Sequence, residues 1–245
     1  MEINFSQRTV TLLGKEKFKK LQSAHVAVFG LGGVGSYALE ALARAGIGTI
    51  TIVDYDRIEE SNINRQILAT YPDIGKYKVD VAEERMLKIN PNITIYKFPT
   101  FITSENISEI LQKRFCFAID AIDTLSSKID LLVALHEEQI FTVSCMGAGM
   151  KIDPLSITVD DISKTHTCPL AKNVRVELRK RGITRNITCV FSTEVPKQKP
   201  IDTNYNNFIT INNNVRKKII GSVSYLPGIF GLISAGVIIQ KITSQ

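Results

Sequence analysis

Two short stretches of the sequence, each directly after an apolar run, hold residues that suit the binding of a nucleoside triphosphate. Arg offers a bidentate fork to phosphate oxygens and Lys a compact point charge, whereas a plain dinucleotide site has no role for both together just past its second strand. Acidic residues beside them could bind ribose hydroxyls or a metal ion. The first stretch supplies Asp54, Asp56, Asn62, Asn64, Arg65 and Gln66, with Lys78 shortly after it, and the second supplies Asp120, Asp123 and Thr124.

A glycine-rich segment, GLGGVG at residues 30–35, precedes both stretches and has the spacing of a phosphate-binding turn. Gly30 permits a tight turn, Gly32 lets the backbone approach a phosphate, and Gly35 lets a helix pack closely on a strand. The free N–H groups of the helix that follows would attract an anion. Asp54, 19 residues after Gly35, is placed for ribose hydroxyls. The alternative is a tight packing turn that binds no ligand.

The role of Asp123 is open on spacing alone. It follows the apolar run FAIDA, where open α/β sheets bind ligands at the carboxyl ends of their strands. A carboxylate there can hold Mg²⁺, which bridges phosphate oxygens. The same carboxylate could instead cap the helix that follows it.

These residues need a framework of alternating strands and helices, which the apolar periodicity predicts. The alternation indicates an α/β fold, Rossmann-like, with a mostly parallel doubly wound sheet and helices on both faces. The predicted strands are 25–30, 49–54, 93–98, 115–121 and 140–149, and the predicted helices are 11–23, 34–46, 78–90, 105–114 with Ser104 as a cap, and 127–138.

After Met150 the pattern changes to a C-terminal extension of mixed strands and helices. We expect a strand over 152–162, a helix over 168–182, a strand over 187–194 and a final apolar helix. The Asn-rich stretch 195–218 is poorly periodic and is interpreted as a mobile loop, centred near 196–215. The predicted organisation is one domain over 1–245, with a nucleotide-binding half, 1–150, and a substrate-facing half, 151–245; the resemblance described below implies that this domain is an adenylating one.

Composition is that of a globular protein of 245 residues, 44% apolar and 22% charged, with a net charge of +6. The polar N-terminus and four cysteines without a CxxC pair favour a reducing, cytoplasmic compartment. Residues 222–240 are uncharged but contain Pro227 and three glycines. We therefore expect a buried helix there rather than a membrane span.

Positive charge concentrates between Lys172 and Lys199, a segment that contains eight Lys or Arg residues and two Glu residues. Its net charge of +6 equals that of the whole chain. A basic helix followed by a basic loop suits a nucleic-acid backbone. The alternative is a solvated helix face. The candidates for contact with a nucleic-acid backbone, which the resemblance described below identifies as tRNA, are Lys172, Arg175, Arg179, Lys180, Arg181 and Arg185, with Arg216, Lys217 and Lys218 in support.

Cys168 precedes Pro169 at a predicted helix start, with Lys164, His166 and Lys172 nearby. Such surroundings lower the pKa of a thiol, so this cysteine could accept sulfur or an acyl group. The simpler interpretation is a partly exposed cysteine at a helix N-terminus. Cys116 and Cys145 open or lie within apolar strands and are expected in the core.

Several motifs resemble the ubiquitin-activating-like superfamily, which contains the ThiF, MoeB and HesA adenylyltransferases. These motifs are GLGGVGSYALEALARAGIGTITIVDYD, ESNINRQ, IGKYKVDVAEERMLKINP and DAIDT. Later motifs are similar to one branch, the tRNA threonylcarbamoyladenosine dehydratases; they are SCMGAGMKIDP, ISKTHTCPLAK, ELRKRGI and GSVSYLPGIFGLISAG. The resemblance covers about residues 5–243.

The resemblance implies a homodimer that binds ATP with Mg²⁺ and transfers AMP to a carboxylate. The catalytic set it implies is Arg8, Arg65, Lys78 and Asp123. It places Asp54 at the ribose, Asp123 at Mg²⁺, and Arg8 at the ATP of the partner subunit. The residues that it places at the phosphates are Gly32, Gly33, Asn62, Arg65 and Lys78.

In this branch the carboxylate belongs to N6-threonylcarbamoyladenosine, beside the tRNA anticodon, and the product is its cyclic, dehydrated form. A carboxylate is a poor electrophile because its leaving group would be oxide, whereas a mixed anhydride with AMP has a good leaving group. A neighbouring ureido atom can then close a five-membered ring at high effective molarity. The resemblance thus implies an ATP-dependent tRNA-modifying dehydratase.

Other functions remain as alternatives. One is an adenylyltransferase for a ubiquitin-like sulfur-carrier protein, although such members usually carry two CxxC pairs for structural Zn²⁺; this chain has none, and no zinc is expected. Another is a nucleotide-binding scaffold that relays sulfur with a cysteine desulfurase system through Cys168. A NAD-dependent dehydrogenase would leave the Arg, Lys and Asp set without a role.

Overall fold

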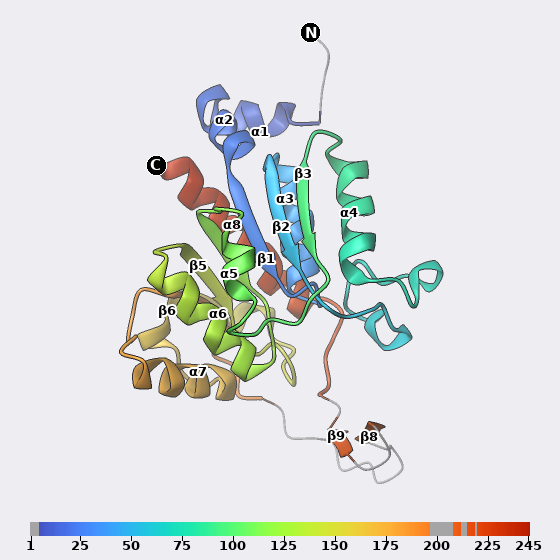
Figure 1. Cartoon of the computed structure of the whole chain (residues 1–245), viewed down its shortest axis with the longest axis vertical. Coiled ribbons are helices and arrows are strands. Elements are labelled where there is room, and N and C mark those ends of the chain that lie inside the picture. The colour runs from blue at the N-terminus through green and yellow to red at the C-terminus, as the bar shows by residue number, and fades with distance from the viewer. Residues whose placement is uncertain (1–4, 197–207, 212–214, 219) are drawn as a thin grey trace.

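The computed structural model describes residues 5–196, 208–211, 215–218 and 220–245. Its centre is a seven-stranded sheet in the order β3-β2-β1-β4-β5-β7-β6, in which only the edge pair β6 and β7 is antiparallel (Figure 1). The strands are β1 (His25–Phe29), β2 (Thr49–Val53), β3 (Thr94–Phe98), β4 (Phe117–Asp120), β5 (Phe141–Cys145), β6 (Ile157–Asp161) and β7 (Thr188–Ser192). The α/β prediction is confirmed. The strand order reverses between β1 and β4, so the crevice for a ligand lies at their carboxyl ends.

Helices cover both faces of this sheet, which explains why its inner strands are mostly apolar on both faces. In β1, Val26 and Val28 belong to the cluster under α2, α3, α4 and α8, whereas Ala27 and Phe29 belong to the opposite cluster under α5 and α6. This is the two-residue alternation of a strand. The helices are α1 (Gln7–Leu13), α2 (Lys15–Ser23), α3 (Gly35–Ala45), α4 (Lys78–Ile89), α5 (Ile107–Leu111), α6 (Leu125–Glu137), α7 (Pro169–Lys180) and α8 (Leu226–Ser244). Short 3-10 turns are η1 (Glu60–Asn62), η2 (Tyr71–Asp73), η3 (Pro154–Ser156) and η4 (Ile162–Lys164).

Helix α8 is the one helix in the described part of the chain that is long and apolar enough to cross a membrane by length and composition. Half of it is buried inside the protein. It crosses α3 so closely that a Cβ on Gly231 would lie 2.2 Å from the carbonyl oxygen of Val34. Such packing is that of a core helix, as the sequence predicted.

Two helix predictions need correction. The helix expected over 11–23 is two helices, α1 and α2, because Gly14 between them has φ +85° and ψ 157°, which no helix accommodates. The helix expected over 105–114 is confined to α5. Its N-cap is Asn106 rather than Ser104, and the Asn106 side chain accepts a hydrogen bond from the backbone of Thr103.

The Asn-rich stretch is not wholly a loop. Residues Phe208–Ile211 form β8 and Val215–Lys218 form β9, which pair as a separate antiparallel two-stranded sheet. The sequence FITI is β-branched and aromatic, so its strand propensity is high despite the asparagines around it. The rest of the predicted mobile loop, 197–207 and 212–214, lies outside the described residues.

Candidate nucleotide-binding site

The glycine-rich turn joins β1 to α3 at the carboxyl end of the sheet (Figure 1). Gly30 has φ +85°, and a Cβ on it would lie 2.8 Å from the carbonyl oxygen of Ala121. A Cβ on Gly35 would lie 1.7 Å from the carbonyl oxygen of Gly30. Only glycine fits at these positions, so the turn is tight and α3 begins directly against β1.

The two middle glycines have different surroundings. A Cβ on Gly32 would meet no atom closer than Nε2 of Gln66, 4.0 Å away, so the space there is open. A Cβ on Gly33 would lie 3.0 Å from Cβ of Pro227 and 3.3 Å from Cγ of Arg65. Gly32 therefore leaves room for a ligand at the N-terminus of α3, whereas Gly33 lets α8 and Arg65 approach the turn.

The side chain of Gln66 gives the strongest indication that a ligand binds here. It is 6% exposed, and its Oε1 is buried without a hydrogen-bond partner among the described residues. Leaving such an atom unpaired costs about 1–3 kcal/mol, and native proteins rarely do so. Because the amide lies beside the open position at Gly32, it offers a donor and an unsatisfied acceptor to a ligand that carries both phosphate and hydroxyl groups.

Asp54, Asp56 and Lys78 form a partly buried charged group at the end of β2. Asp54 accepts hydrogen bonds from the backbone N–H of Leu31 (2.6 Å) and of Asp56 (2.8 Å). The Nζ of Lys78 lies 2.7 Å from Asp56 and 3.8 Å from Asp54. Burial raises the pKa of Asp54, and Lys78 acts in the opposite direction. The Asp54 carboxylate is thus fixed at the glycine turn, where a ribose would lie in a Rossmann-like site.

The segment after β2 brings Arg65 to the same edge. Its side chain is half-buried, and Nη1 donates to the carbonyl oxygen of Ser61 (3.0 Å) and to Oδ1 of Asn64 (2.8 Å). No carboxylate pairs with Arg65 in the described part of the chain, so its charge is available to an anion. Asn62 is buried and bonds locally, accepting from the backbone of Glu59 (3.3 Å), which shapes the turn.

Asp120 and Asp123 have different environments. Asp120 is fully buried, pairs with Lys128 (2.7 Å) and accepts from Oγ of Ser144 (2.6 Å). The backbone N–H of Ile122 donates to Asp120, and Nζ of Lys128 donates to the carbonyl oxygen of Ile122. This network fixes the backbone of 121–124 and leaves Asp120 unavailable to a ligand. Lys128 and Ser144 are positioning residues that the sequence did not reveal.

Asp123 is exposed and makes no ion pair or hydrogen bond with any residue the structure describes. The N-cap of α6 is Thr124, whose side chain makes no capping hydrogen bond, so the interpretation of Asp123 as the cap is wrong. Asp123 lies near Tyr55: burial is the largest cause of the raised pKa of Tyr55, and the charges of Asp56 and Asp123 add to it. The Asp123 carboxylate is free to bind a cation at this edge.

The donor set fits Mg²⁺ that is shared with a nucleotide. Among the residues described here, no group of three or more His, Cys, Asp or Glu side chains could hold a metal ion by itself. Mg²⁺ commonly uses one or two carboxylates and takes its other ligands from phosphates and water. Asp123 fits that single-carboxylate role.

The segment that follows β9 also borders this edge, which the sequence did not indicate. Besides the contact of Pro227 with Gly33, the carbonyl oxygen of Ser222 accepts a hydrogen bond from Asn64 (3.4 Å). The carbonyl oxygen of Gly221 accepts one from the backbone of Met150 (2.9 Å). Residues 220–227 thus connect this edge to the loop after β5. The edge, formed by the carboxyl ends of β1, β2 and β4 with the glycine turn, is the candidate nucleotide site and is called the nucleotide edge.

Arg8 does not join the other predicted residues within its own chain. It is exposed on α1, which lies beside the amino ends of the strands, whereas the glycine turn lies at their carboxyl ends (Figure 1). Any contact between Arg8 and a bound nucleotide would have to be made in a second subunit.

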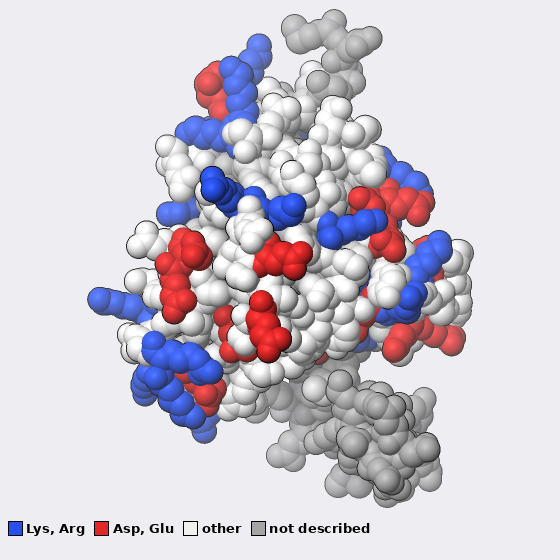
Figure 2. All heavy atoms as spheres, in the orientation of Figure 1, with Lys and Arg blue, Asp and Glu red and all other residues white. Residues whose placement is uncertain are grey.

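The predicted basic helix is α7, and Lys and Arg side chains gather over it in Figure 2. Arg175 is half-buried, and its Nη1 donates to the carbonyl oxygen of Thr165 (2.6 Å) and also contacts Oγ1 of Thr165. Arg185 is exposed and lies on the loop before β7. The side chains of Arg216, Lys217 and Lys218 lie outside the described residues.

The cysteine environments differ from the predicted ones. Cys168 is 2% exposed rather than partly exposed, because it packs into the apolar cluster of α7 and lies against the loop at Gly147. Cys116 is exposed rather than part of the core. Cys145 is buried as expected, and burial raises its pKa to about 12. None of the three buried thiols offers an accessible nucleophile.

Comparisons with a family profile, with curated proteins and with solved structures all indicate the same family. Residues 6–245 match the sequence profile of the ThiF family. The tRNA threonylcarbamoyladenosine dehydratase of Bacillus subtilis is 36% identical over 248 residues, covering 96% of this chain and 93% of the relative. The crystal structure of E. coli tRNA N6-threonylcarbamoyladenosine dehydratase, TcdA, is 32% identical with a TM-score of 0.86, covering 98% of this chain and 94% of that one. Its complex with ATP has a TM-score of 0.84 at 32% identity, covering 98% and 93%.

Proposed function

Because the chain belongs to the ThiF family, we propose that it is an ATP-dependent tRNA threonylcarbamoyladenosine dehydratase. The enzyme transfers AMP from ATP to the carboxylate of N6-threonylcarbamoyladenosine in tRNA and closes the ring with loss of water. The single structural observation that carries the nucleotide part of the proposal is the buried Oε1 of Gln66, which has no hydrogen-bond partner among the described residues and belongs to an amide beside the open position at Gly32. The relatives support this function over the sulfur-carrier alternative.

In this proposal ATP lies across the carboxyl ends of β1, β2 and β4. The turn Gly30–Gly35 and the first N–H groups of α3 hold phosphates. Asp54 accepts hydrogen bonds from the ribose, and Asp56 keeps Lys78 in place. The phosphate ligands are Gly32, Gly33, Asn62, Asn64, Arg65, Gln66 and Lys78, with Thr124 beside Asp123.

The chemistry follows from charge and position. A carboxylate oxygen of the substrate attacks the α-phosphorus of ATP, and pyrophosphate leaves. Arg65 and Lys78 stabilise the charge that develops on the phosphate oxygens, as electrostatic catalysis of phosphoryl transfer requires. Mg²⁺ held by Asp123 would neutralise phosphate charge. A ureido atom then attacks the activated acyl carbon and AMP leaves with the oxygen that the substrate loses.

The proposal includes a homodimer in which Arg8 of α1 reaches the ATP bound to the partner subunit. The exposed position of Arg8, away from its own glycine turn, supports this arrangement. The substrate-facing half, 151–245, presents the basic helix α7 to tRNA, within a single adenylating domain over 1–245. We place the enzyme in the cytoplasm, where its tRNA substrate is available.

A sulfur relay through Cys168 receives no support, because a thiol that is 2% exposed cannot meet a cysteine desulfurase without local opening. If such a system does act on this protein, the exposed Cys116 is the accessible thiol.

The direct test of the site assignment is the release of AMP and pyrophosphate in the presence of tRNA that carries the open-ring nucleoside. Asp123→Ala and Arg65→Ala should abolish release, whereas Asp130→Ala, a carboxylate on α6 outside this set, should not. Full activity of Asp123→Ala would disprove the assigned role. Release stimulated by a carrier protein ending in Gly-Gly, but not by tRNA, would favour the alternative function.

A further inference from the structure

The cations of α7 fall into two groups that differ in their partners. Lys180 and Arg181 are paired with Glu177, at 2.7 Å and 3.4 Å. Lys172 and Arg179 are exposed, and their side chains make no ion pair or hydrogen bond with any residue within the described ranges. They are seven residues apart, two helical turns, and therefore lie on one face of α7, whereas Glu177 and its partners lie on another.

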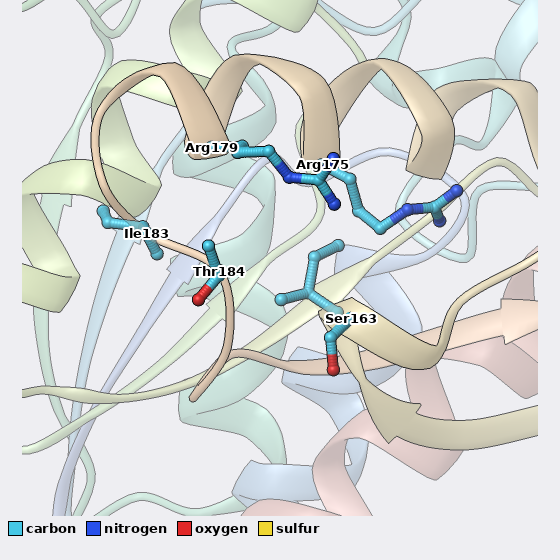
Figure 3. Close-up of a pocket in the computed structure, with 6 residues that line it drawn as sticks. Ser163, Arg175, Arg179, Ile183 and Thr184 are labelled. Carbon is cyan, nitrogen blue, oxygen red and sulfur yellow. The ribbon is translucent and has the colours of Figure 1, made fainter.

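Arg179 also lines a hollow in the surface. Its lining residues are Ile162, Ser163, Arg175, Arg179, Ile183 and Thr184. The hollow is shallow, with room inside for about one water molecule, and no acidic residue lines it. Figure 3 shows the guanidinium of Arg179 reaching over this space from α7, with Thr184 on the facing loop.

Arg175 lines the hollow with a side chain that is held in one position. Its guanidinium is tied to Thr165 and is not balanced by a carboxylate of the described chain, so it adds positive potential without being free to move. Arg179 lies four residues later on the same face, and none of its guanidinium N–H groups is bound to an acceptor among the described residues. An Arg with free donors beside a second, immobilised Arg is suited to a phosphate group, which Arg binds in bidentate fashion.

We propose that Arg179 binds one phosphate of the tRNA backbone over the mouth of this hollow, and that Lys172 contacts a second phosphate further along the same face of α7. This inference rests on the proposed function, because it takes tRNA as the partner. Lys172 and Arg179 are separated by about 10 Å along the helix. Lys180 and Arg181 share the single carboxylate of Glu177, so each contributes less than the unpaired Arg179.

The position of α7 relative to the nucleotide edge supports a shared ligand. The helix begins at Cys168, whose Sγ would lie 3.5 Å from a Cβ on Gly147 in the loop after β5. Arg179 is about 15 Å further along the helix axis. One RNA molecule could therefore present a nucleoside at the glycine turn and its backbone at the hollow.

The test compares Arg179→Ala with Lys180→Ala, two exposed residues of one helix that each lose one positive charge. The dissociation constant for tRNA carrying N6-threonylcarbamoyladenosine is measured between 50 and 200 mM salt, about the range in which backbone contacts dominate. Arg179→Ala should weaken binding by about 5- to 10-fold and reduce the slope of log Kd against log salt by about one. Lys180→Ala should stay within about twofold of the unmodified protein.

Two outcomes overturn the inference: equal weakening by the two variants, or unchanged binding in Arg179→Ala. Lys88→Ala on α4, an exposed lysine remote from α7, controls for net charge. Ring closure is followed in the same samples. If the unmodified protein binds tRNA but forms no cyclic product, the proposed function fails while the comparison of Arg179 with Lys180 still decides the binding site.

Discussion

Replacing Lys128 by methionine should destabilise the protein and displace the loop that carries Asp123. The Nζ of Lys128 donates to Asp120 at 2.7 Å and to the carbonyl oxygen of Ile122 at 2.9 Å, and both charged side chains are 0% exposed. Methionine keeps most of the aliphatic volume but removes the charge. Asp120 would then be an uncompensated buried carboxylate.

The size of the effect follows from what Asp120 retains. Breaking a buried ion pair by removing one partner costs about 3–5 kcal/mol. Asp120 keeps its hydrogen bonds from Ser144 (2.6 Å) and from the backbone of Ile122 (3.1 Å), and these bonds reduce the loss of unfolding free energy. We therefore expect about 3 kcal/mol. Ser144→Ala, which removes one hydrogen bond and leaves the ion pair, should cost about 1 kcal/mol.

Urea unfolding followed by circular dichroism measures the effect as a fall in the unfolding midpoint at unchanged slope. The control is Lys88→Met, in which the lysine is 73% exposed and paired with Glu84 on the surface. That change should cost less than about 0.5 kcal/mol. Equal urea midpoints for Lys128→Met and Lys88→Met would show that the buried pair of Lys128 and Asp120 does not stabilise the fold.

Three further predictions follow from the same geometry. Gln66→Leu should weaken ATP binding about tenfold in a calorimetric titration while leaving the ATP-free protein as stable or up to about 1 kcal/mol more stable, because it removes an unpaired buried atom; a clear loss of stability would contradict the ligand role. Gly35→Ala should prevent stable folding, because its Cβ would lie 1.7 Å from a backbone oxygen, whereas Gly75→Ala, with φ +88° but nothing within 4 Å, should cost only about 1 kcal/mol in a thermal melt. A thiol reagent at pH 8 should modify only Cys116 in the native protein and all four cysteines in urea, since Cys145 has a pKa of about 12; rapid loss of a second thiol would refute the buried assignment.

The geometry of the glycine turn and of the strand ends beside it was predictable because the information for it is local. Gly30 and Gly35 are fixed by the backbone geometry of one turn, and Asp54 by the end of one strand. In a parallel sheet all strand ends meet at one edge, so the chain order of apolar runs suffices to bring Asp123 there as well.

The roles of other residues depend on how separate elements dock. Asp120 and Asp123 look equivalent in the sequence, but only the packing of α6 on β4 buries Asp120 against Lys128 and leaves Asp123 free. Cys168 is buried because the loop after β5 lies against it, a contact between Gly147 and Cys168, which are 21 residues apart. The division of α7 into paired and unpaired cations is, by contrast, local: Glu177 is three and four residues before Lys180 and Arg181, a helical spacing that a count of charges overlooks.

The central claim is ATP-dependent dehydration of a tRNA nucleoside, and mass spectrometry of digested tRNA tests it most directly. The protein is incubated with ATP, Mg²⁺ and tRNA that carries open-ring N6-threonylcarbamoyladenosine, and the nucleosides are analysed under conditions that preserve the cyclic form. The account predicts loss of one water from that nucleoside, only when ATP is present, with one AMP formed per ring closed. An unchanged nucleoside mass with active ATP-binding protein would contradict it.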